Sequence, residues 1–96
     1  MALNEIVRRS IEKGIRENIE GYKGWNIDHI RGKQIWHYEN ETDFWYGHLI
    51  GSLIALSYTA FKSATTNIPS EEEQQEIWKL VQVHSTEIRE IVKSWK

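Results

Sequence analysis

The stretch from Thr42 to Ser63 constrains the fold of this chain more than any other segment. Thr42 or Asp43 can cap the start of a helix, and the residues that follow are apolar on almost every side of a helical projection. Its apolar side chains are Phe44, Trp45, Leu49, Ile50, Leu53, Ile54, Leu56, Tyr58 and Phe61. Such a helix lies inside a bundle or crosses a membrane. Because His48, Ser52, Ser57 and Thr59 interrupt the run, we predict a core helix over about 43–63, enclosed by protein on most sides.

The N-terminal segment has the pattern of an amphipathic helix over about residues 4–20. Asn4 is a suitable N-cap, and apolar residues recur every four positions at Leu3, Val7, Ile11, Ile15 and Ile19. The opposite face carries opposite charges four residues apart, as expected of a face in water. Gly14, inside this helix, costs about 1 kcal/mol relative to alanine. It marks either the close approach of another element or a tolerated defect.

A single long helix is predicted over about residues 71–95. Ser70 and Glu73 stand at the spacing of a capping box, which marks a helix start. An apolar seam follows, with steps of three and four residues, at Ile77, Val81, His84, Ile88, Ile91 and Trp95. A seam with this period packs along another helix. We interpret His84 as a core histidine that is hydrogen-bonded through one ring nitrogen.

The segment at about 25–39 is compatible with two structures. Trp25, Ile27 and His29 alternate with polar residues, and Gly32 could form the turn of a β-hairpin. Asn26 could instead cap a short fourth helix. We favour the hairpin. The sequence therefore predicts a mostly α fold, a small bundle of three main helices (about 4–20, 43–63, 71–95) within a single helical domain spanning 1–96, plus the hairpin or short helix.

Composition excludes several classes of protein. The chain of 96 residues has no cysteine, so it has no disulfide framework and no thiolate chemistry. Its 12 Lys and Arg residues against 14 Asp and Glu residues give a net charge of −2, which argues against a broad basic surface for duplex DNA. The N-terminus lacks the apolar run of a signal peptide. We expect a cytoplasmic protein with no membrane contact.

The spacing of the titratable residues argues against a metal site. Four histidines occur, at positions 29, 37, 48 and 84. No two of them are three or four residues apart, and none follows a glutamate at ligand spacing. Glycine-rich phosphate loops and serine-centred catalytic motifs are also lacking. We therefore predict no metal, no cofactor and no evident catalytic activity.

Small residues recur every four positions at Gly47, Gly51 and Ala55. This spacing lets another helix backbone approach closely. The neighbour could be a helix of the same chain, which we favour, or a second subunit. We assign the packing or interface role to these three residues and to the seam residues Ile77, Val81, Ile88 and Trp95. Because the helix at 43–63 needs covering on all sides, a homodimer or another protein partner is expected.

Arg31 and His37, in the stretch Arg-Gly-Lys-Gln-Ile-Trp-His, resemble the arginine–histidine motif of the HEPN family of small helical ribonucleases. The resemblance covers residues 31–37 of the chain, and Gly32 stands where that family usually has a small polar residue. It implies that Arg31 neutralises an RNA phosphate, that His37 acts as acid or base, and that two subunits form the site. HEPN-like ribonuclease activity is thus an alternative function.

Aromatic residues are frequent around the middle of the chain, at Trp25, Trp36, Tyr38, Trp45 and Tyr46. They could stack on the bases of single-stranded nucleic acid, which is a second alternative, although we favour a core role for them. The leading hypothesis is a small intracellular helical module for protein–protein interaction and assembly. It rests on the excess of apolar helix surface and on the lack of a catalytic motif.

Overall fold

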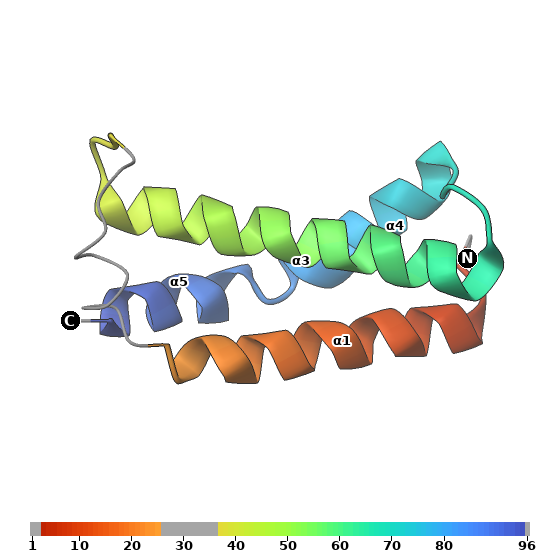
Figure 1. The fold of residues 1–96 in the computed structure, drawn as a ribbon, viewed down its shortest axis with the longest axis horizontal. Helices are drawn as coiled ribbons and strands as arrows, with labels where there is room; N and C mark the ends of the chain where they lie inside the picture. The colour runs from red at the N-terminus through yellow and green to blue at the C-terminus, as the bar shows by residue number, and fades with distance from the viewer. Residues whose placement is uncertain (1–2, 26–36, 96) are drawn as a thin grey trace.

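In the computed structural model, which describes residues 3–25 and 37–95, the chain forms a helical bundle (Figure 1). Its helices are α1 (Glu5–Lys23), α3 (Glu41–Thr65), α4 (Glu71–Gln82) and α5 (Ser85–Ser94). The described residues contain no β-strand, so the mostly α prediction is confirmed. Residues 26–36, which hold most of the predicted hairpin or short helix, lie outside the described part. The described residues on either side of them, Trp25 and 37–39, are neither helix nor strand.

The helix α3 is the element against which the others pack. It contacts α1 along one side and both α4 and α5 along another. Figure 1 shows α1 and α3 running along the length of the molecule, with α4 and α5 in succession behind them. Fully buried side chains come from all four described helices, at Ile11, Leu49, Leu53, Ile77, Val81 and Ile88. One hydrophobic core therefore joins the described helices.

The sequence pattern of α1 explains its structure. The side chain of Asn4 accepts a hydrogen bond of 2.8 Å from the backbone N–H of Ile6, so the predicted cap is present. The residues at four-residue spacing, Leu3, Val7, Ile11, Ile15 and Ile19, are all buried. The helix continues to Lys23, beyond the predicted end, and Gly24 caps it. The predicted amphipathic helix is therefore present and somewhat longer.

The start of α3 differs from the expectation. The N-cap is Asn40, whose side chain accepts a hydrogen bond of 2.9 Å from the backbone N–H of Asp43. Thr42 and Asp43, the residues predicted to cap this helix, lie inside its first turn. At the other end, Thr66 adopts a left-handed conformation with φ of 62° and stops the helix. A non-glycine residue in this conformation was not foreseeable from turn signals, which favour glycine or asparagine.

The prediction of a single helix over 71–95 is wrong. The chain forms two helices there, α4 and α5, separated by Val83 and His84. His84 has φ of −99° and ψ of 3°, which interrupts the helical hydrogen bonds. The residues around the break, Val83 to Thr86, are all weak helix formers, so interrupting the helix here costs little. The side chain of His84 is 26% exposed and contacts Glu87, with Nδ1 3.3 Å from a carboxylate oxygen. It is bonded through one nitrogen, as predicted, but it is not a core residue.

Candidate functional site

The outer side of α3 is an exposed helix surface that carries no charge. Between Asp43 and Lys62, none of residues 44–61 is Asp, Glu, Lys or Arg. The exposed residues of this stretch are Gly47, His48, Gly51, Ala55, Leu56 and Thr59, which we call the uncharged face. Leu49 and Leu53 are fully buried on the inner side. Within the described residues, protein therefore covers most of this helix, with Ile50 and Ile54 packed against the core, and leaves one side exposed.

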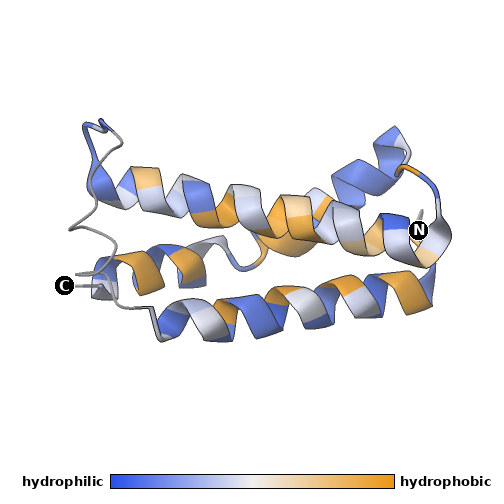
Figure 2. Cartoon of the chain, viewed as in Figure 1, coloured by the Kyte–Doolittle hydropathy of each residue, from blue (hydrophilic) through white to orange (hydrophobic). Residues whose placement is uncertain are grey.

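The outer side of α1 shows what a solvated helix surface of this protein looks like. Opposite charges pair along it, for example Arg8 with Glu12 at 3.1 Å and Arg16 with Glu12 at 3.5 Å. Figure 2 shows hydrophilic residues recurring along α1, whereas the middle of α3 is mostly apolar or intermediate. Monomeric proteins keep continuous apolar surface small, and a larger patch commonly marks an interaction site. The contrast with α1 singles out the uncharged face as the candidate site.

The small residues of the uncharged face contact no other helix that the structure describes. A Cβ atom built at Gly47 or at Gly51 would meet nothing within 4 Å outside the local helix backbone. Ala55 is exposed as well. The described residues therefore lend no support to the favoured interpretation of this spacing, tight packing within one chain, and the role of these three residues stays a prediction. At Gly14 in α1, an added Cβ would also meet nothing within 4 Å, which favours the tolerated defect over the close approach of another element.

A groove lies beside the uncharged face, between α3 and the helices α4 and α5. Its volume is about 220 Å³, and its lining is Tyr46, Ile50, Ile54, Trp78, Val81, Gln82 and Ser85. Trp78 is 55% exposed, and its indole N–H donates a hydrogen bond of 2.6 Å to the hydroxyl oxygen of Tyr58. Sequence reasoning missed Trp78, although its position next to Ile77 of the seam placed it at the edge of a buried face.

Ion pairs and acidic residues mark the start of α3. Arg89 of α5 donates to a carboxylate oxygen of Asp43 at 2.9 Å, and its guanidinium lies over the ring of Tyr46, 4.1 Å from the ring centre. The hydrogen bond to Asp43 raises the pKa of Arg89 above its ordinary value. At the far end of the face, Lys62 is exposed. No ion pair of Lys62 is found among the residues that the structure describes.

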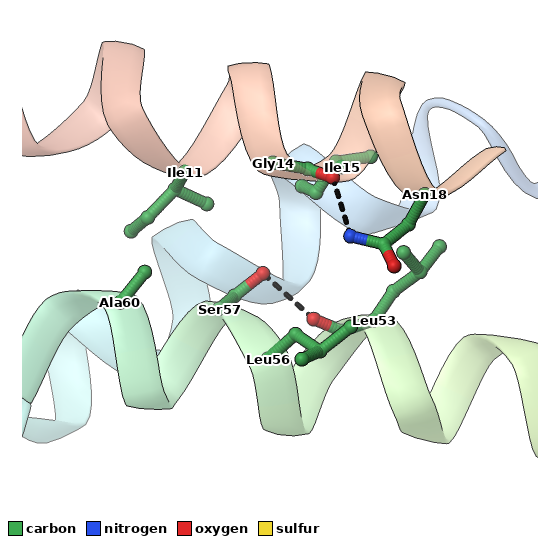
Figure 3. Close-up of a pocket in the computed structure, with 8 residues that line it drawn as sticks. All are labelled: Ile11, Gly14, Ile15, Asn18, Leu53, Leu56, Ser57 and Ala60. Atoms are coloured by element: carbon green, nitrogen blue, oxygen red, sulfur yellow. Dashed lines mark hydrogen bonds between the residues drawn. The ribbon is translucent and has the colours of Figure 1, made fainter. Parts of the chain in front are cut away.

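A second, smaller hollow lies between α1 and α3 (Figure 3). It measures about 30 Å³, which is room for one or two water molecules. Its polar groups bond within their own helices, Asn18 to the carbonyl of Gly14 at 2.8 Å and Ser57 to the carbonyl of Leu53 at 2.7 Å. No ionisable or nucleophilic group other than the hydroxyl of Ser57 lines it. The hollow is a packing gap beside Gly14 rather than a chemical site.

The four seam residues with a predicted interface role lie in the interior of their own chain. Ile77, Val81 and Ile88 are at most 1% exposed, and Trp95 is 5% exposed. The indole N–H of Trp95 donates to the backbone carbonyl of Tyr22 at 3.2 Å. They hold α4 and α5 against the rest of the bundle, so they contribute little accessible surface to a partner.

The residues of the two alternative hypotheses are only partly described. Arg31 and Trp36 lie outside the described residues, and His37 is exposed. Trp25 stacks on Trp95 with ring centres 5.6 Å apart, whereas Trp45 contacts Phe44 edge-on at 5.0 Å. No ring contact joins Trp25 to Trp45 among the described residues. The described residues therefore do not form a site for the ribonuclease hypothesis or for the nucleic-acid-binding hypothesis.

Two further kinds of site, a metal centre and a membrane span, have no candidate in the described residues. In residues 3–25 and 37–95, no three His, Cys, Asp or Glu side chains lie close enough together to hold a metal ion. No helix in these residues combines the length and the apolarity that a membrane span requires. Comparison of the chain with models of protein families, with curated proteins and with solved structures finds no match.

Proposed function

We propose that this chain is a self-associating helical assembly module and that a second copy covers the uncharged face of α3. The observation that carries the proposal is an exposed helix surface without a charged residue from position 44 to position 61. Burial of apolar surface gains about 25 cal/mol per Å². A face without charges avoids the desolvation cost that charged side chains would impose. Burying this face in an interface is therefore more favourable in free energy than burying the charged outer side of α1.

The size and shape of the face support pairing with another helix. Gly47, Gly51 and Ala55 leave the backbone of α3 open along one line, and small residues allow close contact between helices. Trp78 and Tyr58 stand beside this line and offer aromatic area, and tryptophan and tyrosine are enriched among the residues that dominate binding energy. The surface thus offers both small residues and aromatic side chains to a second copy.

A pair of matched lysine substitutions tests the proposal. Gly51→Lys places a charge and a long side chain at the centre of the uncharged face, and Gly21→Lys makes the same change on the exposed side of α1. Neither glycine has an atom within 4 Å of an added Cβ, so neither change clashes within the chain. Both changes favour the helix, because glycine is the weaker helix former.

In sedimentation equilibrium, we expect the wild type and Gly21→Lys to form dimers at micromolar to hundred-micromolar concentration. Gly51→Lys should remain monomeric over the same range, with its helical circular dichroism unchanged. A wild type that stays monomeric throughout would refute the proposal. So would a Gly51→Lys variant that dimerises as strongly as the wild type, because association would then use another surface.

A further inference from the structure

We infer that the break between α4 and α5 is a hinge, and that two copies of the chain exchange α5 through it. In the exchanged dimer, α4 and α5 of each copy form one continuous helix. Each α5 then lies in the α5 site of the other copy, by which we mean the surface of α1 and α3 that α5 covers. The inference does not rest on the proposed function, because it involves the interior of the bundle rather than the uncharged face.

The backbone at the break is close to that of a helix. Val83 has φ of −63° and ψ of −17°, and its N–H donates to the carbonyl of Lys79 at 3.2 Å. His84 departs further from helical geometry, with φ of −99° and ψ of 3°, and its N–H donates to the carbonyl of Val81, three residues back, at 3.0 Å. Residues 71–95 contain no glycine or proline, the residue types that would enforce a break. A small backbone change at His84 would therefore make the helix continuous.

Hydrogen bonding near the break favours the continuous helix. The first N–H groups of a helix have no partners within it, and His84, the N-cap residue of α5, makes no side-chain cap bond. In a continuous helix, these N–H groups would bond to carbonyls in the last turn of α4. The break therefore persists in a single copy because α5 packs against the rest of its chain, and not because the local sequence requires it.

The apolar seam continues across the break without a change of period. Its steps of four and three residues run from Ile77 to Trp95, so one uninterrupted helix would carry the whole seam on one side. In a single copy, the chain changes direction between α4 and α5 (Figure 1), and both halves of the seam pack on one core. A continuous helix would move Ile88, Ile91 and Trp95 away from that core. Because these side chains are buried in the single copy, they need another apolar surface, which the exchanged dimer supplies.

The contacts of α5 determine what fills the vacated α5 site. Arg89 donates to a carboxylate oxygen of Asp43 in α3 at 2.9 Å, and the indole N–H of Trp95 donates to the backbone carbonyl of Tyr22 in α1 at 3.2 Å. The α5 of a second copy presents the same side chains in the same order, so it forms every one of these contacts again. In a two-fold dimer each copy fills the site of the other, and such an exchange is a low-cost route to a dimer.

Charge reversal of the pair between Asp43 and Arg89 can detect the exchange. Asp43→Arg and Arg89→Asp each place like charges together within one copy. In an exchanged dimer with one copy of each variant, both bundles regain opposite charges at this pair, because α5 comes from the other copy. In a dimer that forms without exchange, each copy keeps its own like-charged pair. Both side chains are partly exposed, so neither change buries an unpaired charge.

The two variants are mixed, unfolded in urea and refolded together at several hundred micromolar, since exchange requires α5 of both copies to leave its site. Native mass spectrometry then counts heterodimers and homodimers. We expect their ratio to lie about fivefold above the value for random pairing, because each heterodimer regains two exposed ion pairs. Lys13→Glu and Glu17→Lys are the matched controls, since this pair lies within α1 at 3.9 Å and should give the random value. A random ratio for the Asp43 and Arg89 variants, or no dimer at all, would overturn the inference.

A second pair of variants tests the hinge itself. His84→Ala and His84→Asn both remove the imidazole and its contact with Glu87. Alanine favours a continuous helix, whereas asparagine is a weaker helix former and one of the best N-caps, which favours the break. After refolding at equal concentration, we expect about threefold more dimer in His84→Ala than in His84→Asn. Equal amounts, or more dimer in His84→Asn, would show that the break is not the hinge.

The Gly51→Lys variant separates this inference from the proposed function. Dimers that form through the uncharged face need no unfolding and should be lost in Gly51→Lys. Exchanged dimers should still form when Gly51→Lys is refolded at high concentration. If refolding yields dimers of the wild type but none of Gly51→Lys, the dimers use the uncharged face, which overturns the inference and leaves the proposed function standing.

Discussion

Gly14 is a helix glycine that no neighbouring element requires. Glycine inside a helix invites the interpretation that another backbone passes close by. Instead an added Cβ would meet nothing within 4 Å, and the residue borders a hollow of about 30 Å³ between α1 and α3. The hydrogen bond from Asn18 reaches the backbone carbonyl of Gly14, so it does not depend on the missing side chain. Glycine at this position therefore makes α1 less stable than alanine would.

We therefore expect Gly14→Ala to raise the free energy of unfolding by about 1 kcal/mol, because alanine is the better helix former and the space for its methyl group is open. Urea unfolding followed by circular dichroism measures the change. Gly21→Ala, in the last turn of α1, serves as a control and should gain less. A destabilised Gly14→Ala variant would mean that the two helices lie closer together in solution.

Among the elements, α3 depends on a cap that the sequence pattern placed elsewhere. Asn40 satisfies the backbone N–H of Asp43 at the helix start, and loss of such a cap typically costs about 1 kcal/mol. We expect Asn40→Ala to lower the free energy of unfolding by about this amount. Thr42→Ala, which alters the predicted cap, should cost distinctly less. Equal effects of the two changes in urea unfolding would contradict the observed cap.

How much of each element was predictable depends on whether its signal is local. The capping of α1 by Asn4 and of α4 by Ser70 follows from side chains near the caps, and both caps are present. The break at His84 was missed because the apolar seam continues through it: Val81 and Ile88 face the core on either side. The period of the apolar residues shows which of them face the core, but it does not show where one helix ends and the next begins.

The sequence shows that residues 44–61 carry no charge, but it does not show which side of the helix stays exposed. The pattern of residues 44–61 indicated a helix needing cover on all sides, and Gly47, Gly51 and Ala55 were singled out as a packing line. Whether the cover comes from the same chain depends on how far α1, α4 and α5 reach around α3, which is a property of the tertiary arrangement. The role of Trp78 is not predictable for the same reason, because its hydrogen bond to Tyr58 joins two helices.

At the scale of the whole molecule, size connects stability with association. A chain of 96 residues buries only roughly 60 to 65% of the surface that its unfolded form exposes, so its stability as a monomer is modest. The outer side of α1 carries charged side chains, and the uncharged face of α3 is exposed. Covering that face by a second copy would add stability in proportion to the dimer formed, because only the folded chain binds.

We therefore expect the melting temperature of the wild type to rise with protein concentration, by several degrees between about 5 and 500 μM if the dimer dissociates in the micromolar range. Gly51→Lys should melt at a temperature independent of concentration, since the proposed interface is lost while the helix is retained. Gly21→Lys should follow the wild type. Differential scanning calorimetry measures all three proteins, and a wild-type melting temperature that does not move over this range would show that folding and self-association are not coupled.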